Sequence, residues 1–344
     1  MQARVARDYL RVRAAYFWLR PLLYSTLTIA SLGAEKRSPM EGSHVTLVPR
    51  VAAACILIGY FAAPVAASAQ AFDWVPESRT GGKLLLTGGV STIEGSGGGG
   101  LATWATTTGY GAEDGVGGNV HATYVNLPDY ELRSWGAAVG LWDRVELSVA
   151  RQEFDTGDTG TALGLGRGFT FTQDIVGVKV RLLGDAVYGQ DSWMPQVAVG
   201  LQHKSNDQGA IITAVGGKDD EGTEAYVAAT KLFLAQSLLV SGAVRWTDAN
   251  QTGLLGFGGD RNDDLEPQFE GSVGYLLSRN LVIGAEYRTK PDNLGFAGED
   301  DWVDVYAAYA INKHLSLTAA WVDLGSIATF EDQRGLFLSL QAGF

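Results

Sequence analysis

Apolar and polar residues alternate along much of the chain between Lys83 and Phe344. In residues 237–248, one face of an extended strand would carry Leu238, Val240, Val244 and Trp246, and the other would carry polar residues such as Arg245. Because successive side chains of a strand point to opposite faces, this pattern predicts strands with one apolar face and one polar face. Segments of about ten residues with this alternation, separated by turn residues, are typical of transmembrane β-barrels.

The alternation and the turn residues predict an all-β, antiparallel, up-and-down barrel of about fourteen strands. The expected strands are 83–93, 101–109, 118–127, 131–141, 144–153, 171–183, 193–204, 223–233, 236–248, 265–277, 280–289, 300–311, 314–324 and 335–344. Glycine-rich stretches at 95–100 and 109–118 blur the first three strands, so twelve strands is the alternative. An even number places both chain ends on one side, as closure of a single-chain bacterial barrel requires.

Long polar connectors alternate with short turns. The long ones, at about 154–170, 205–222, 249–264, 290–299 and 325–334, all fall on the side opposite the C-terminus. This asymmetry is expected when the C-terminus is periplasmic and the long loops face outward. The connector at 184–192 is the exception, because it is long for an inner turn.

The last strand carries a second signal. Leu336, Leu338, Leu340, Ala342 and Phe344 share one face and end in an aromatic residue at the C-terminus. This pattern resembles the C-terminal assembly signature of bacterial outer-membrane β-barrels. The resemblance implies a bacterial outer-membrane location, with membrane lipid and the barrel-assembly machinery as partners.

The N-terminal region indicates a leader. An uncharged stretch follows Arg50, with an apolar core at 51–66, and ends in Ala67-Ser68-Ala69, which predicts a signal peptide cleaved after Ala69. We therefore expect an extension and leader at 1–69, a short periplasmic segment at 70–82 and a barrel at 83–344. Two explanations of residues 1–39 remain open. Either the start codon was assigned too early and translation begins at Met40, or translation begins at Met1 and the leader is unusually long.

Composition removes several function classes. Residues 70–344 contain no cysteine, since Cys55 is the only one, and carry 18 Lys/Arg against 35 Asp/Glu. Nucleic acid is therefore not an expected partner, and neither a disulfide nor a thiolate metal site can form. No apolar run in this part approaches eighteen residues, which argues against helical spans. No cofactor is expected.

Charged residues on the expected inner faces are the candidate functional residues. Placing a charged side chain in contact with lipid costs free energy, so we expect these residues to line the lumen. They are Glu146, Lys179, Arg181, Lys231, Arg245, Glu270, Glu286, Arg288 and Asp304. Two arrangements follow. Either the charges border a water-filled passage, which predicts a porin-like passive channel for a small polar solute, or they pair and close the lumen, which predicts a structural or surface-contact barrel.

Catalysis and metal binding find little support. His314 and Ser316 share a strand face, as in the His-x-Ser pair of the outer-membrane phospholipase, but they sit at the inner end of their strand, away from outer-leaflet lipid. We expect no enzyme. Acidic clusters at 218–221, 260–264 and 299–301 have no complete calcium-loop spacing, but they offer contact with lipopolysaccharide through bridging cations.

From Gly81 onward the chain also resembles a proteobacterial outer-membrane β-barrel family catalogued only as a domain of unknown function. The matching stretches are Gly82–Gly89, Trp142–Ser148, Phe154–Asp158, Leu163–Phe169, Tyr226–Lys231, Leu255–Asn262 and Tyr287–Gly295. This resemblance implies a Gram-negative outer-membrane barrel and brings no activity, substrate or site residue.

Overall fold

The computed structural model describes residues 82–113 and 115–344. The expected leader at 1–69, its cleavage after Ala69, the choice between Met1 and Met40, and nearly all of the expected periplasmic segment at 70–82 lie outside these residues.

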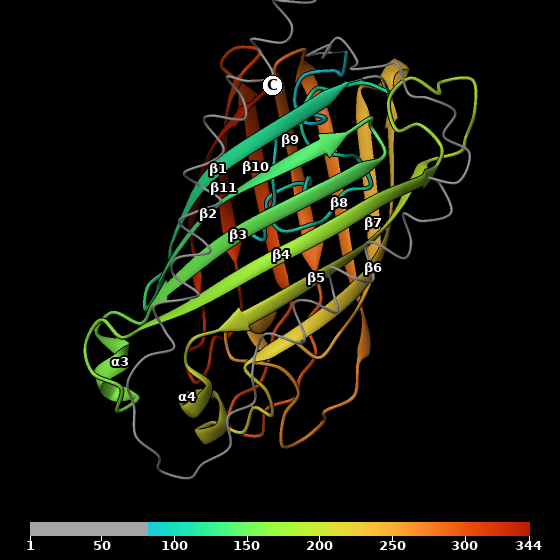
Figure 1. Cartoon of the computed structure of the whole chain (residues 1–344). Helices are drawn as coiled ribbons and strands as arrows, with labels where there is room; N and C mark the ends of the chain where they lie inside the picture. Colours follow the sequence, from blue (N-terminus) through green and yellow to red (C-terminus); the bar gives the residue numbers. More distant parts are fainter. Residues whose placement is uncertain (1–81, 114) are drawn as a thin grey trace, which may run out of the picture. The chain divides into compact units, whose positions relative to one another are not determined.

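Twelve antiparallel strands form one closed barrel (Figure 1), in which each strand pairs with its neighbours in sequence and β12 pairs with β1. The strands are β1 (Val116–Asn126), β2 (Glu131–Leu141), β3 (Val145–Asp155), β4 (Thr170–Leu183), β5 (Gln196–Asn206), β6 (Glu221–Phe233), β7 (Leu238–Thr247), β8 (Glu266–Ser278), β9 (Leu281–Arg288), β10 (Trp302–Ala310), β11 (Leu315–Asp323) and β12 (Arg334–Gly343).

The all-β up-and-down barrel is confirmed with the alternative count of twelve, and the leading count of fourteen is wrong. The twelve expected strands from 118–127 onward correspond to β1–β12, whereas 83–93 and 101–109 form no wall strand. They belong to a segment that lies inside the barrel. Their apolar and threonine-rich sequence imitates a strand, but its side chains meet the inner wall instead of lipid.

The predicted alternation holds along the wall. In β7, Val240, Gly242 and Trp246 are exposed on the outer surface, while Ser241, Ala243 and Arg245 are buried inside. The predicted greasy face of β12 also points outward, with Leu336, Leu338, Leu340, Ala342 and Phe344 all exposed. These outward apolar side chains suit contact with lipid hydrocarbon. The closed sheet also leaves no strand edge with unpaired backbone groups, which a bilayer would not tolerate.

The tryptophans of the wall do not all face the same way. Trp302 is 2% exposed and packs inside the barrel, where the Lys290 ammonium lies 5.0 Å from its ring centre. Trp246 and Trp321, by contrast, are exposed on the outer surface. The first residue of β10 therefore points into the barrel and not toward the membrane interface.

The two ends of the barrel differ. We call the end that carries the C-terminus and the connectors between β2–β3, β4–β5, β6–β7, β8–β9 and β10–β11 the turn end, and the opposite end the loop end. The loop end carries α3 (Thr159–Ala162), α4 (Gly209–Ala214) and the 3₁₀ turn η2 (Asn250–Gly253), and a further 3₁₀ turn, η1 (Leu234–Gln236), lies in a turn-end connector. None of the helices in the described part is long and apolar enough to cross a bilayer.

Candidate functional site

Residues 82–111, which we call the interior segment, fill the barrel (Figure 1, cyan). The segment enters and leaves at the turn end, where Gly82 and Gly111 form an antiparallel bridge. Between these points almost every residue from Leu86 onward is buried. At its deepest part, the carbonyl oxygen of Ile93 accepts hydrogen bonds from Ser134 and Gln152, which lie toward the loop-end half of β2 and β3.

The backbone of the interior segment is paired partly within the segment and partly with side chains of the wall. The wall carboxylates accept hydrogen bonds from its N–H groups: Glu146 from Gly97 and Thr108, Glu270 from Thr103, and Glu286 from Leu101, over 2.6 to 3.0 Å. The β-bridges of the segment are all internal, and none joins it to a wall strand. Buried backbone groups need partners, so these side chains take the place of a strand ladder.

The glycine run at 97–100 is required by close approach to the wall. An added Cβ would lie 1.7 Å from Glu286 Oε1 at Gly99 and 2.9 Å from Glu146 Oε2 at Gly97. The run turns against wall carboxylates, and the next helix in the described chain is α3, so the glycines do not form a phosphate-binding loop that leads into a helix.

We expect Gly99→Ala to loosen the interior segment by about 1–3 kcal/mol, because Glu286 must give up its hydrogen bonds to the segment to make room. Proteolysis or hydrogen exchange of residues 82–111 in the folded barrel would measure this. Gly271→Ala is the matched control, since a Cβ there meets nothing within 4 Å. Equal protection in both variants would contradict the close approach.

All nine candidate lumen residues are buried in the barrel, each at most 8% exposed. They are Glu146, Lys179, Arg181, Lys231, Arg245, Glu270, Glu286, Arg288 and Asp304. The structure brings them together in several groups, most of which contact the interior segment.

The largest group, which we call the charge cluster, comprises Glu94, Glu224, Glu270, Lys204, Arg245 and Arg288. Glu94, from the interior segment, bonds to Lys204 and, over 3.0 Å, to Arg288. Arg245 reaches Glu270 over 2.6 Å and Glu224 over 3.1 Å. Three carboxylates balance three cations, so the charges largely compensate one another inside the barrel.

Near the turn end, Lys179 forms a second buried group with Glu146. Its ammonium lies 3.1 Å from the Glu146 carboxylate and donates to the carbonyl oxygens of Gly97 and Thr106 over 3.0 and 2.8 Å. Lys179 therefore binds both the wall and the interior segment.

Arg181 and Lys231 bind the connector between β4 and β5. Arg181 pairs with Asp143 and donates to the carbonyl of Gly184, and Lys231 donates to the carbonyl of Gly189 over 2.6 Å. This connector was the unusually long inner turn in the sequence. Its Ala186 and Val187 are buried in the main apolar cluster, so the extra length covers the turn end.

Glu286 and Asp304 form the remaining group. They are directly opposite each other on β9 and β10, and both face the interior. Glu286 Oε2 accepts N–H groups of Leu101 and Ala102. Neither oxygen of Asp304 has a hydrogen-bond partner in residues 82–113 and 115–344, and no ion pair there reaches either carboxylate.

The loop end is covered by residues 249–258. Residues 249–257 are buried, and the carbonyl oxygen of Thr252 accepts from Gln173 and Lys204 of the wall. Beside them, Lys290 lies 2.8 Å from Glu299. Their side chains are 2% and 1% exposed, and this burial lowers the pKa of Lys290 and raises the pKa of Glu299.

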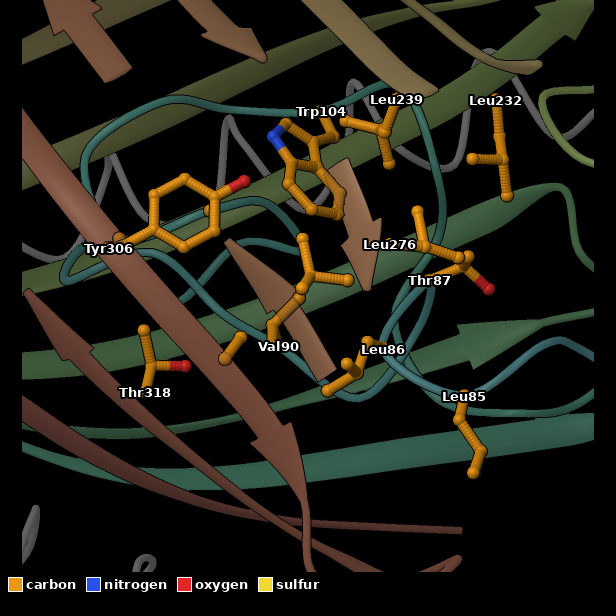
Figure 2. Close-up of a pocket in the computed structure, with 14 residues that line it drawn as sticks. Leu85, Leu86, Thr87, Val90, Trp104, Leu232, Leu239, Leu276, Tyr306 and Thr318 are labelled. Atoms are coloured by element: carbon orange, nitrogen blue, oxygen red, sulfur yellow. The ribbon is translucent and has the colours of Figure 1, made fainter. Parts of the chain in front are cut away.

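An apolar region also lies in the turn-end half of the interior, beside the charged groups at that end. Leu86, Val90 and Trp104 of the interior segment pack against wall residues such as Leu239 and Tyr306 around a narrow cavity (Figure 2). The cavity has a volume of about 20 Å³, enough for a single water molecule. The interior therefore holds no ligand-sized cavity at this point.

Sequence reasoning missed three members of the charge cluster: Glu94, Lys204 and Glu224. Glu94 lay just beyond the end of the expected strand 83–93, and Lys204 and Glu224 lay at the ends of theirs. A signal was present, because Glu94 is the only charged residue between positions 84 and 112. A lone charge in an uncharged stretch indicates a buried, paired carboxylate.

The pair considered for catalysis makes separate contacts. His314 lies at the turn end against the carbonyl oxygen of Gly343, and the Ser316 hydroxyl donates to the carbonyl oxygen of Gly89. The described residues contain no group of three or more His, Cys, Asp or Glu side chains placed to hold a metal ion.

Residues 87–341 match the family described as "Protein of unknown function (DUF3034)". Solved structures with a similar fold include the KdgM porin, with 10% identity, a TM-score of 0.44 and coverage of 66% of this chain and 99% of that chain. The NanC porin has 11% identity, a TM-score of 0.42 and coverage of 66% and 98%. Omp33 of Acinetobacter baumannii has 9% identity, a TM-score of 0.41 and coverage of 66% and 97%. No curated protein matches the sequence.

Proposed function

The chain belongs to the DUF3034 family, whose function is unknown, and we propose that in the bacterial outer membrane it acts as a channel for small polar solutes, closed at rest by residues 82–111. The proposal keeps the passage expected from the charged inner wall. It adds that the passage opens only when the interior segment moves.

One observation carries the proposal: both ends of the interior segment lie at the turn end, and the segment forms no β-ladder with the wall. Its two ends meet at the Gly82–Gly111 bridge, and the wall ladder closes independently through β1 and β12. The segment can therefore leave without breaking a strand pair. Once the segment has left, the inner wall would present its charged and polar groups to water. A purely structural barrel does not need these buried groups, because an apolar interior is at least as stable.

The width of the barrel is compatible with a passage. Eight strands leave room for little more than side chains, and sixteen to eighteen leave an open aqueous channel. Twelve strands fall between these limits, so the lumen can hold either a folded segment of this length or a water-filled path.

The proposal includes the parts that lie outside the described residues. The leader at 1–69 is removed, the outward-facing terminal strand with Phe344 is recognised by the barrel-assembly machinery, and the loop end faces the exterior beside lipopolysaccharide.

Planar-bilayer recordings of the folded protein test this function. We expect a mainly closed trace with discrete steps when the interior segment is loosened, as in Gly99→Ala. If neither the native chain nor a variant without the segment conducts, the channel proposal fails.

A second candidate is a structural or surface-contact barrel with a permanently closed lumen. Closure at both ends, by the 184–195 connector and by residues 249–258, favours it. A deletion strain with unchanged solute permeability and a weakened envelope would support this function over the channel.

A further inference from the structure

Four side chains inside the barrel form an oxygen-rich group that is not part of the charge cluster. Ser272 on β8 is in register with Glu286 on β9, which is in register with Asp304 on β10, and Tyr306 follows Asp304 on the same face. Side chains directly opposite on antiparallel strands have Cβ atoms about 4.5–5.5 Å apart. The register therefore brings two carboxylates and two hydroxyls into one small region of the wall.

Five oxygen atoms of this group have no hydrogen-bond partner within the described ranges. They are Ser272 Oγ, Glu286 Oε1, both carboxylate oxygens of Asp304 and Tyr306 Oη. All four side chains are at most 5% exposed. The Ser272 hydroxyl lies close to both Glu286 and Tyr306, which allows only weak contacts among these three side chains, and Tyr306 lies near both carboxylates. No cation in the described residues is paired with either carboxylate, so this concentration of poorly satisfied oxygens indicates a missing positive charge.

The neighbouring basic side chains do not supply that charge. Arg288, two residues beyond Glu286 on the same face, directs its guanidinium to Glu94 over 3.0 Å and lies 3.8 Å from Glu270. Lys290 is held by Glu299. The charge cluster is balanced within itself, and Lys179 is balanced by Glu146. Glu286 and Asp304 thus leave two buried carboxylates without a counter-ion.

We propose that Ser272, Glu286, Asp304 and Tyr306 form a site for one divalent cation of the calcium type. Ca²⁺ binds six to eight oxygen ligands at irregular angles, and carboxylates and hydroxyls with water can provide them. Mg²⁺ gives up its water shell reluctantly and demands octahedral geometry, so it fits a dry site of this kind poorly. One divalent ion neutralises the two carboxylates.

The cation would also secure the interior segment. Glu286 Oε2 accepts hydrogen bonds from the N–H groups of Leu101 and Ala102, while its Oε1 accepts none within the described residues and is available to the proposed ion. Removing the ion leaves two like charges opposite each other and weakens the carboxylate that holds the segment. The site does not depend on whether the barrel conducts.

The test is calorimetric titration of CaCl₂ into the EDTA-treated, folded barrel in detergent. We expect one Ca²⁺ per barrel, with affinity reduced at least about tenfold in Asp304→Asn. Tyr306→Phe, which keeps the shape of the side chain, provides a second variant if Asp304→Asn folds poorly, and it should also weaken binding. Ca²⁺ is expected to raise the unfolding temperature of the native chain, and Mg²⁺ is expected to raise it less.

The control removes exposed acids at the loop end. Asp300→Asn with Asp332→Asn should keep the tight Ca²⁺ site, because both side chains are exposed on the loops. Loss of binding in this control with full binding in Asp304→Asn would assign Ca²⁺ to the surface and overturn the proposal. Absence of Ca²⁺ binding, together with an unfolding temperature that falls as pH rises, would also overturn it, because the carboxyl groups would then be held neutral by protons.

Discussion

Replacing residues 84–110 with a short glycine–serine linker is expected to turn the closed barrel into one that conducts continuously in a planar bilayer. Gly82 and Gly111 form a β-bridge, so a few linker residues can join the remaining chain without strain. The wall keeps every strand pair, including β1 with β12, because the interior segment contributes to none of them.

The conductance follows from what deletion exposes. The loop-end half of the wall would present Lys204, Glu224, Arg245, Glu270 and Arg288 to the lumen, and these groups would take up water. We also expect a large fall in unfolding temperature, since Leu86, Val90, Ile93, Leu101 and Trp104 leave an apolar cluster.

Single-channel recording measures the first effect, and heat-dependent gel mobility measures the second and verifies folding. A folded deletion variant that stays silent would contradict the role of the interior segment. In that case residues 249–258 alone would be sufficient to close the lumen.

Glu94→Gln is expected to release the interior segment while leaving the wall intact. The Glu94 carboxylate binds Lys204 and Arg288, and lies 3.6 Å from Arg245. With a neutral amide in its place, three buried cations share two carboxylates. Breaking a buried ion pair by changing one partner costs about 3–5 kcal/mol, because the other charge stays buried and uncompensated.

The expected results for Glu94→Gln are a lower unfolding temperature, faster proteolysis of residues 82–111 and frequent channel openings. Glu113→Gln is the matched control, since it makes the same change at an exposed position just beyond the segment. If the two variants behave alike, the charge cluster does not hold the segment in place.

The sequence was sufficient to predict the wall. Strands from β1 to β12 were recognisable because each has a lipid face, and hydrocarbon demands apolar side chains at every second position. In β12 this produced the outward row ending at Phe344, and in β4 it placed Lys179 and Arg181 inside. The same physical constraint identified nine of the buried wall charges and missed Lys204 and Glu224.

The interior segment could not be predicted in the same way. Lipid does not constrain it, and its environment is set by wall residues distant in sequence: Thr103 bonds to Glu270, and Glu94 to Arg288. Such pairings have no local periodicity. The Leu84–Thr87 and Leu101–Ala105 stretches resemble strands because the same apolar and threonine residues suit a packed lumen. The glycine run at 97–100, which lies between these two expected strands, was the available warning, and it supported twelve strands as the alternative count.

The most direct test is whether water-soluble reagents reach position 105. Ala105 belongs to the interior segment and is fully buried against wall residues such as Ala198 and Tyr226. Residues 70–344 contain no cysteine, so Ala105→Cys in a chain starting at Gln70 carries a single thiol. A water-soluble maleimide should label it at least about a hundredfold more slowly than Ser192→Cys in the exposed turn-end connector, because labelling requires the segment to leave the barrel. Equal labelling rates in the folded barrel would show that the lumen is open and would contradict the account.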